Sequence, residues 1–220
     1  MKTVAISDIN ILRVIHRDTQ KVSYGCSQEW FATEWQRRAG CGPSVASNIF
    51  LYLSRTRFPK SGKPPVYRED FAALMEYVWG YVTPGQQGIP ETKMLREGME
   101  TCAEAKGLVL ESCVCDVPEA VTARPSTAEI TSFLENALGR DAPVAFLNLC
   151  NGEEKNLDRW HWVTIVSLER DVSEKIFLHA LDGGVVKTID LTLWRDTTTC
   201  GGGFVWFDPV KKTGTGSYEL

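Results

Sequence analysis

The sequence predicts a single α+β domain, because helical patterns fill the first two-thirds of the chain and strand patterns fill the last third. Alternating strand and helix units, which would predict a parallel sheet, do not occur. Of the 220 residues, 43% are hydrophobic and 24% are charged, so one sizeable core can form. We assign residues 1–210 to this domain and expect the polar segment 211–220 to be a flexible tail.

The first two-thirds contain four predicted helices and three predicted strands, of which two lie near the N-terminus. These two strands are expected over residues 9–16 and 21–31, around a turn. Helical spacing of apolar residues, with proline or glycine after each pattern, predicts helices over 43–53, 69–82 and 91–106. Ser126 and Glu129 form a capping-box pair, which predicts the start of a fourth helix that ends near Gly139.

Short segments rich in β-branched and aromatic residues predict the strands, which dominate the last third of the chain. They cover residues 108–114, 143–150, 160–168, 175–181, 185–189 and 204–207. The segments 160–168 and 175–181 are expected to pair as a hairpin, which would bring the end of the second strand close to the start of the first. We therefore expect the helices to pack on one antiparallel sheet.

Cys41 lies in the segment Gly40-Cys41-Gly42-Pro43, directly before an apolar helical pattern. Proline is favoured in the first turn of a helix, so Cys41 should lie at a helix N-terminus, where free N–H groups and the helix dipole stabilise a thiolate. A free cysteine is more commonly a small buried side chain, but flanking glycines favour close approach of a substrate. Cys41 is thus the candidate nucleophile. We expect the remaining cysteines to be buried and unreactive: Cys26, Cys102, Cys113, Cys115, Cys150 and Cys200.

His161 is the candidate general base, because it begins a strand pattern directly after the polar loop 151–159. The chain has only three histidines, so candidate bases are few. The next strand pattern leads to Asp182, which hairpin pairing would bring close to His161. A cysteine, a histidine and an acid that converge in this way are typical of covalent acyl transfer.

Alternatives exist for both the base and the acid. His179 is a rival base, but it lies three residues before Asp182 on one predicted strand, so the two side chains face opposite sides and do not pair. Asp182 also belongs to an Asp-Gly pair, which is common in turns. Asp190 and Asp196 are the alternative acids.

These motifs resemble those of papain-like cysteine peptidases, most nearly the bacterial peptidase C39-like group. The likeness rests on Gln36 upstream of Cys41-Gly42-Pro43, on His161 at the start of a strand, and on Asp182 after the next strand. Gln36 stands one position closer to the cysteine than in many papain relatives. The resemblance implies a papain-like two-layer fold, with N-terminal helices packed on a C-terminal antiparallel sheet and a cleft between the layers.

The resemblance also implies a role for each of the four residues. Cys41 would be the nucleophile and His161 the general base and acid. Asp182 would orient His161, and Gln36 would donate to the oxyanion. A peptide or amide would be cleaved through a thioester, with no cofactor and no metal. A papain-like acyl or peptidyl transferase would use the same thioester, whereas a catalytically silent peptide-binding module would keep only the cleft.

Composition limits the partners. A net charge of −4 and a pI near 5.5 argue against nucleic acid as a partner, since its binding proteins are basic. We expect no membrane association, because the N-terminus lacks a secretory signal and no run of about 18 apolar residues occurs. Seven scattered cysteines favour a reducing cytoplasm, and the spacing of Cys113 and Cys115 matches no common zinc site. No pattern specifies an oligomeric state.

Overall fold

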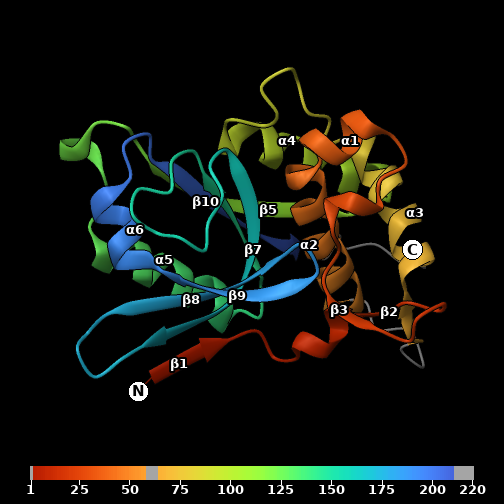
Figure 1. Ribbon diagram of the computed structural model, residues 1–220, viewed down its shortest axis with the longest axis horizontal. Helices are drawn as coiled ribbons and strands as arrows, with labels where there is room; N and C mark the ends of the chain where they lie inside the picture. Colours follow the sequence, from red (N-terminus) through yellow and green to blue (C-terminus); the bar gives the residue numbers. More distant parts are fainter. Residues whose placement is uncertain (1, 58–63, 211–220) are drawn as a thin grey trace.

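The computed structural model describes residues 2–57 and 64–210 (Figure 1). Within these ranges the chain forms six α-helices, a seven-stranded antiparallel sheet and a smaller three-stranded sheet. The expected α+β class is therefore confirmed. The tail expected at 211–220 lies outside the described residues. None of the helices in the described part of the chain has the length and hydropathy that a bilayer crossing needs.

The seven-stranded sheet carries most of the fold. Its strands lie in the order β5 (Val109–Val117), β10 (Gly202–Val210), β6 (Val144–Asn148), β7 (His161–Arg170), β8 (Ile176–Asp182) and β9 (Val185–Asp190). The N-terminal strand β1 (Lys2–Ala5), which sequence patterns did not predict, pairs with the second half of β7. The expected hairpin of β7 and β8 is confirmed, with Thr164 opposite Leu181, so the start of β7 lies beside the end of β8.

Helices cover both faces of this sheet. One core joins α5 (Thr127–Gly139) and α6 (Leu191–Thr197) to side chains such as Phe146 and Phe204. A second core joins α2 (Cys41–Arg57) and α4 (Thr92–Ala105) to side chains such as Ala145, Leu147 and Val205. Successive residues of a strand face opposite sides, and every residue of β6 is buried, so both faces need cover. The structure thus differs from the expected two-layer arrangement by the helices on the second face.

The N-terminal region departs most from the sequence expectations. Residues 9–16 contain a 3₁₀ turn, Ile9–Leu12, and only a short strand, β2 (Arg13–Ile15). Residues 21–31 contain β3 (Val22–Tyr24) and a second 3₁₀ turn, Gln28–Trp30. Each turn begins at a residue whose side chain accepts a backbone N–H bond, Asp8 or Ser27, and this local bonding competes with an extended strand.

Two further helices and one strand complete the fold. The short α1 (Glu34–Ala39) has a capping box, Thr33 with Gln36, which the sequence contains but which we did not predict. The helix expected over 69–82 is α3 (Arg68–Trp79). The two-residue strand β4 (Val66–Tyr67) pairs with β2 in the small sheet. In Figure 1, α1, α2 and α3 lie together on one side of the molecule, beside the large sheet.

Candidate active site

Cys41 is the first residue of α2, directly after Gly40, which ends α1. The junction of the two helices is tight. A Cβ atom at Gly40 would lie only 2.7 Å from the ring of Phe31, so this position requires glycine. The side chain of Cys41 is half-buried. Residues 40–43 therefore hold a partly accessible thiol at the N-terminus of a long buried helix, as the sequence predicted.

His161 and Asp182 meet at the end of the β7–β8 hairpin. His161 is the first residue of β7 and Asp182 is the last residue of β8. The Nε2 atom of His161 lies 2.8 Å from Oδ1 of Asp182, and the two side chains are only 14% and 12% exposed. The expected proximity of these residues is thus present as a direct, mostly buried hydrogen bond.

The ionisation of His161 reflects both of its neighbours. Burial is the largest effect and opposes the charged imidazolium. The hydrogen bond to Asp182 and the interactions with Cys41 outweigh burial and raise the pKa of His161 to about 10. The ring therefore carries its proton at neutral pH and interacts with both Cys41 and Asp182.

Lys187 is a second partner of Asp182. Its Nζ lies 2.7 Å from Oδ2 of Asp182, while Oδ1 receives His161. Burial opposes ionisation of this carboxyl, but the hydrogen bonds and charges of His161 and Lys187 lower the pKa of Asp182 below its usual value. Asp182 is therefore an anion bound on both oxygens, which fixes its orientation. Lys187, on β9, was not a sequence candidate.

The alternative residues have other partners. His179 lies on β8 with Nδ1 3.3 Å from the hydroxyl of Thr188 and Nε2 3.5 Å from the carboxylate of Glu169. Asp190 accepts the N–H of Leu193 and caps α6, and Asp196 pairs with Arg195. Cys41 and His161 line one cavity with Asp182, whereas none of these alternatives lines it.

Gln36 does not lie in the cavities that Cys41 lines. Its Oε1 accepts bonds from the backbone and the hydroxyl of Thr33, in the capping box of α1. Its Nε2 donates to a carboxylate oxygen of Glu76 at 2.6 Å. Gln36 is thus buried and bound at the start of α1, and the structure does not bring it together with Cys41.

A different glutamine lines the site. Gln28 contributes to a cavity of about 30 Å³ that is also lined by Cys41, His161 and Asp182. Its Nε2 donates to the carbonyl of Arg37 at 2.8 Å. Among the described residues its Oε1 is buried without a hydrogen-bond partner. An amide nitrogen has two hydrogens, so one N–H of Gln28 remains for a further acceptor. The sequence motif did not identify Gln28, because this residue lies farther before Cys41 in the sequence than Gln36 does.

No protein-family model matches the chain, and no curated protein matches it.

The loop before His161 is fixed by buried side chains. Asn148 donates to the carbonyl of Asp158 at 2.6 Å. The buried carboxylate of Glu154 accepts the N–H groups of Asn156 at 2.8 Å and Asp190 at 2.7 Å. These bonds tie residues 151–160 to strands on either side. His161 thus follows a loop with a defined path, as a positioned catalytic base requires.

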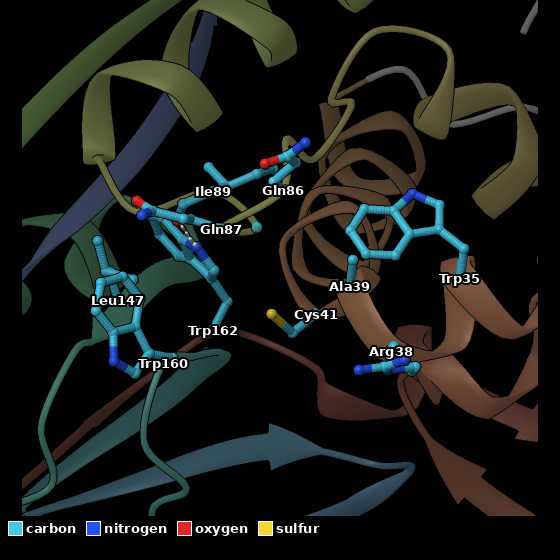
Figure 2. Close-up of a pocket in the computed structure, with 11 residues that line it drawn as sticks. Trp35, Arg38, Ala39, Cys41, Gln86, Gln87, Ile89, Leu147, Trp160 and Trp162 are labelled. Atoms are coloured by element: carbon cyan, nitrogen blue, oxygen red, sulfur yellow. Dashed lines mark hydrogen bonds between the residues drawn. The ribbon is translucent and has the colours of Figure 1, made fainter.

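A larger cavity of about 220 Å³ is also lined by Cys41 (Figure 2). In the figure, Trp35 and Arg38 lie on one side of the thiol, and Trp160 and Trp162 lie on the other. The indole of Trp162 donates to the carbonyl of Ile89 at 2.8 Å, which ties β7 to the hairpin loop 85–89 at the edge of the cavity. This space can receive the group attached to a carbonyl at Cys41.

The other thiols are not all alike. Burial raises the pKa of Cys26 to about 12, and burial likewise raises the pKa values of Cys102 and Cys115 to about 11, so these three are unreactive. The structure contradicts the sequence expectation at two cysteines: Cys113 is exposed, and Cys150, although buried, has a lowered pKa. A hydrogen bond from the hydroxyl of Thr199, at 3.1 Å, is the main cause that lowers the pKa of Cys150 to about 7.

One cluster in the described part of the chain has the composition of a metal site. Asp158, His161 and Asp182 each present a ligand atom, and these atoms lie within 4.8 Å of one another. Two of these side chains already form the His161–Asp182 hydrogen bond. A bound divalent cation would compete with that bond, so the cluster fits acid–base chemistry better than metal binding.

Proposed function

We propose that this chain is a thiol hydrolase that cleaves peptide or amide bonds through Cys41, His161 and Asp182. The observation that carries the proposal is the position of His161, whose ring is bonded to Asp182 and interacts with the thiol of Cys41 at a helix N-terminus. The order and location of these residues support a papain-like enzyme that resembles the peptidase C39-like group.

The first half of the reaction acylates Cys41. The thiol proton resides on His161, so the thiolate attacks the substrate carbonyl and forms a carbon–sulfur bond. The tetrahedral intermediate collapses, the carbon–nitrogen bond breaks, and His161 gives its proton to the leaving amine. Asp182 holds the ring orientation and stabilises the imidazolium before that transfer.

The second half releases the acyl group. Neutral His161 removes a proton from water, and the resulting hydroxide attacks the thioester carbonyl. The carbon–sulfur bond then breaks, which gives a carboxylic acid and restores the thiolate–imidazolium pair. An amine in place of water would make the enzyme a transferase, so the acceptor distinguishes the two activities.

Gln28 replaces Gln36 as the proposed oxyanion donor. The free N–H of its side chain and the N–H groups in the first turn of α2 are the donors available beside Cys41. Such donors stabilise negative charge that develops in the transition state, and removal of one typically costs about 3–4 kcal/mol. The capping bonds of Gln36 leave it a structural role at α1.

The experiment is cleavage of a peptide library, with products identified by mass spectrometry. Cys41→Ala should abolish product formation, and Cys102→Ala, which changes a buried thiol with a raised pKa, should retain it. Hydroxylamine added as a competing acceptor should trap acyl hydroxamates if the thioester forms. Equal product from wild type and Cys41→Ala, or no product and no trapped acyl group from folded wild type, would refute the proposal.

A further inference from the structure

The cavity of about 220 Å³ beside Cys41 contains a positive charge without an anionic partner. Arg38 lines this cavity, is exposed, and makes no ion pair with any residue in the described ranges. Its neighbour Arg37 differs, because its guanidinium donates to the carbonyl of Phe31 at 3.0 Å and to that of Ala32 at 2.9 Å. Arg37 thus has a structural role, whereas Arg38 is available to a ligand.

The electrostatics around Cys41 favour an anion. None of the residues that line the larger cavity is acidic. The imidazolium of His161 already interacts with Cys41 and with the carboxylate of Asp182, so it adds no free positive charge, and Arg38 is the cation at this cavity that is available to a ligand. The chain as a whole carries a net charge of −4, so attraction of an anionic ligand must come from this local arrangement and not from the overall charge.

Two exposed tryptophans stand at the same cavity. Trp35 is 47% exposed and Trp160 is 52% exposed, although large aromatic side chains gain free energy when they are buried. Trp160 also has a φ of 53°, a left-handed conformation that is strained for a bulky residue and that occurs preferentially at functional sites. These exposed rings leave apolar surface for a ligand to cover, with Trp35 on the same side of Cys41 as Arg38 and Trp160 on the other side (Figure 2).

The hairpin loop 85–89 adds polar groups to this edge. Gly85 and Gly88 exchange two backbone hydrogen bonds at 3.0 Å, which makes a tight turn. Gln86 and Gln87 lie at its tip and line the cavity. Figure 2 shows this turn on the side of Cys41 opposite Arg38. Amide side chains of this kind can bond to the backbone of a peptide without adding charge.

Resting on the hydrolase activity proposed above, we propose that the substrate is an acidic peptide, in which a carboxylate near the scissile bond pairs with Arg38. Apolar groups of the same peptide pack against Trp35 on that side of Cys41 and against Trp160 on the other side. An arginine binds a carboxylate through two parallel N–H bonds, which makes it the preferred residue for this recognition. The carboxylate can belong to a Glu or Asp side chain or to the end of the peptide.

Matched peptides test the preference for an acid. Each peptide is synthesised with Glu or Gln at every position within three residues of the cleaved bond, and each is made with a free or an amidated C-terminus. We expect kcat/KM to be higher for at least one acidic form by about tenfold or more, the size typical of a charge-assisted hydrogen bond. If Glu raises kcat/KM relative to Gln, the carboxylate that Arg38 binds belongs to an acidic side chain. If the free C-terminus raises kcat/KM relative to the amidated one, the carboxylate belongs to the end of the peptide.

Arg38→Gln should reduce the preference to about twofold or less, and because the preference is a ratio of kcat/KM values for matched peptides, a general loss of activity in the variant does not change it. Arg13→Gln, which removes an exposed arginine on β2 remote from the cavity, is the matched control and should keep the preference. If the acidic preference survives Arg38→Gln, or if wild type cleaves acidic and neutral peptides equally, the substrate proposal is wrong.

Binding to Cys41→Ala separates this proposal from the hydrolase proposal. Tryptophan fluorescence reports binding of the same peptides without turnover. Binding that prefers the acidic form and requires Arg38, together with no cleavage by wild type, would support the acidic ligand and refute the hydrolase. Cleavage by wild type with no acidic preference in either assay would support the hydrolase and refute the acidic substrate.

Discussion

Asn48 and Thr164 form a buried hydrogen bond that joins the helix of Cys41 to the strand of His161. The Nδ2 atom of Asn48, on α2, donates to the hydroxyl of Thr164, on β7, at 3.0 Å. The Oδ1 atom of Asn48 accepts the backbone N–H of Cys26 at 2.9 Å. Both the nitrogen and the oxygen of the Asn48 side chain are therefore hydrogen-bonded. The bond to Thr164 fixes α2, which carries Cys41, relative to β7, which carries His161.

Asn48→Ala should destabilise the protein by about 2–3 kcal/mol, because it leaves the hydroxyl of Thr164 and the N–H of Cys26 buried without partners. It should also lower kcat, since the distance between Cys41 and His161 would no longer be fixed. Urea denaturation and peptide cleavage measure the two effects. Asn136→Ala changes an exposed residue of α5 and should alter stability by less than about 0.5 kcal/mol. Equal stability of the two variants would contradict this role.

Asp182→Asn should lower the pKa of His161 from its value of about 10, because Asp182 provides the strongest interaction that raises it. A raised pKa means that the stabilising contribution of the imidazolium is complete below its ordinary value of 6.5 and is lost as the pH rises through about 10. The alkaline limb of the pH–rate profile, and the alkaline loss of stability, should therefore move to lower pH. Asp190→Asn should leave both in place, and an unchanged limb in Asp182→Asn would contradict the assignment.

Two substitutions at Trp160 test its backbone conformation separately from its contribution to the cavity. Glycine adopts a φ of 53° freely, whereas alanine does not, so Trp160→Gly should be more stable than Trp160→Ala by about 1 kcal/mol, the reverse of their usual order. Both variants should raise KM, because both remove an aromatic wall of the cavity. Thermal denaturation and steady-state kinetics provide the test. A less stable glycine variant would show that the left-handed conformation is not retained in solution.

Substitution of Gln28 and substitution of Gln36 should have different effects on the catalytic rate. Gln28→Ala should lower kcat by about 100-fold to 1000-fold, the loss typical of one oxyanion donor. Gln36→Ala should retain the rate but lose about 1 kcal/mol of stability, because it breaks the capping box and the bond to Glu76. The kinetic constants and the urea midpoint of each variant decide between the two residues. If Gln36→Ala loses the rate and Gln28→Ala keeps it, the replacement proposed here is wrong.

Local sequence signals predicted those parts of the fold that local chemistry determines. The pair Ser126 and Glu129 predicted α5, and the structure contains both reciprocal bonds of this capping box. The order of strand patterns predicted the β7–β8 hairpin, and with it the contact between His161 and Asp182. These predictions succeeded because each depends on residues that are near in sequence or joined by a short turn.

The parts that failed depend on which partner each side chain selects, and motif spacing does not encode this even for residues that are near in sequence. Gln28 reaches the site only because its turn packs against the junction of α1 and α2 through the carbonyl of Arg37. Lys187 reaches Asp182 across a strand pair. Thr33 and Gln36 match the capping-box pattern, but the papain resemblance implied a catalytic role for Gln36, and the helix start at Thr33 was not predicted. Motif spacing alone could not reveal these arrangements.

We propose that Cys41 reacts as a thiolate paired with His161. The most direct test is the rate of iodoacetamide alkylation at neutral pH, resolved by peptide mass spectrometry because the chain has six other cysteines and the pKa of one of them, Cys150, is also lowered. His161→Ala should slow alkylation of Cys41 by about tenfold or more, with Cys150 as the internal reference, and His179→Ala should leave the rate at Cys41 unchanged. A slower rate in His179→Ala together with an unchanged rate in His161→Ala would contradict the account.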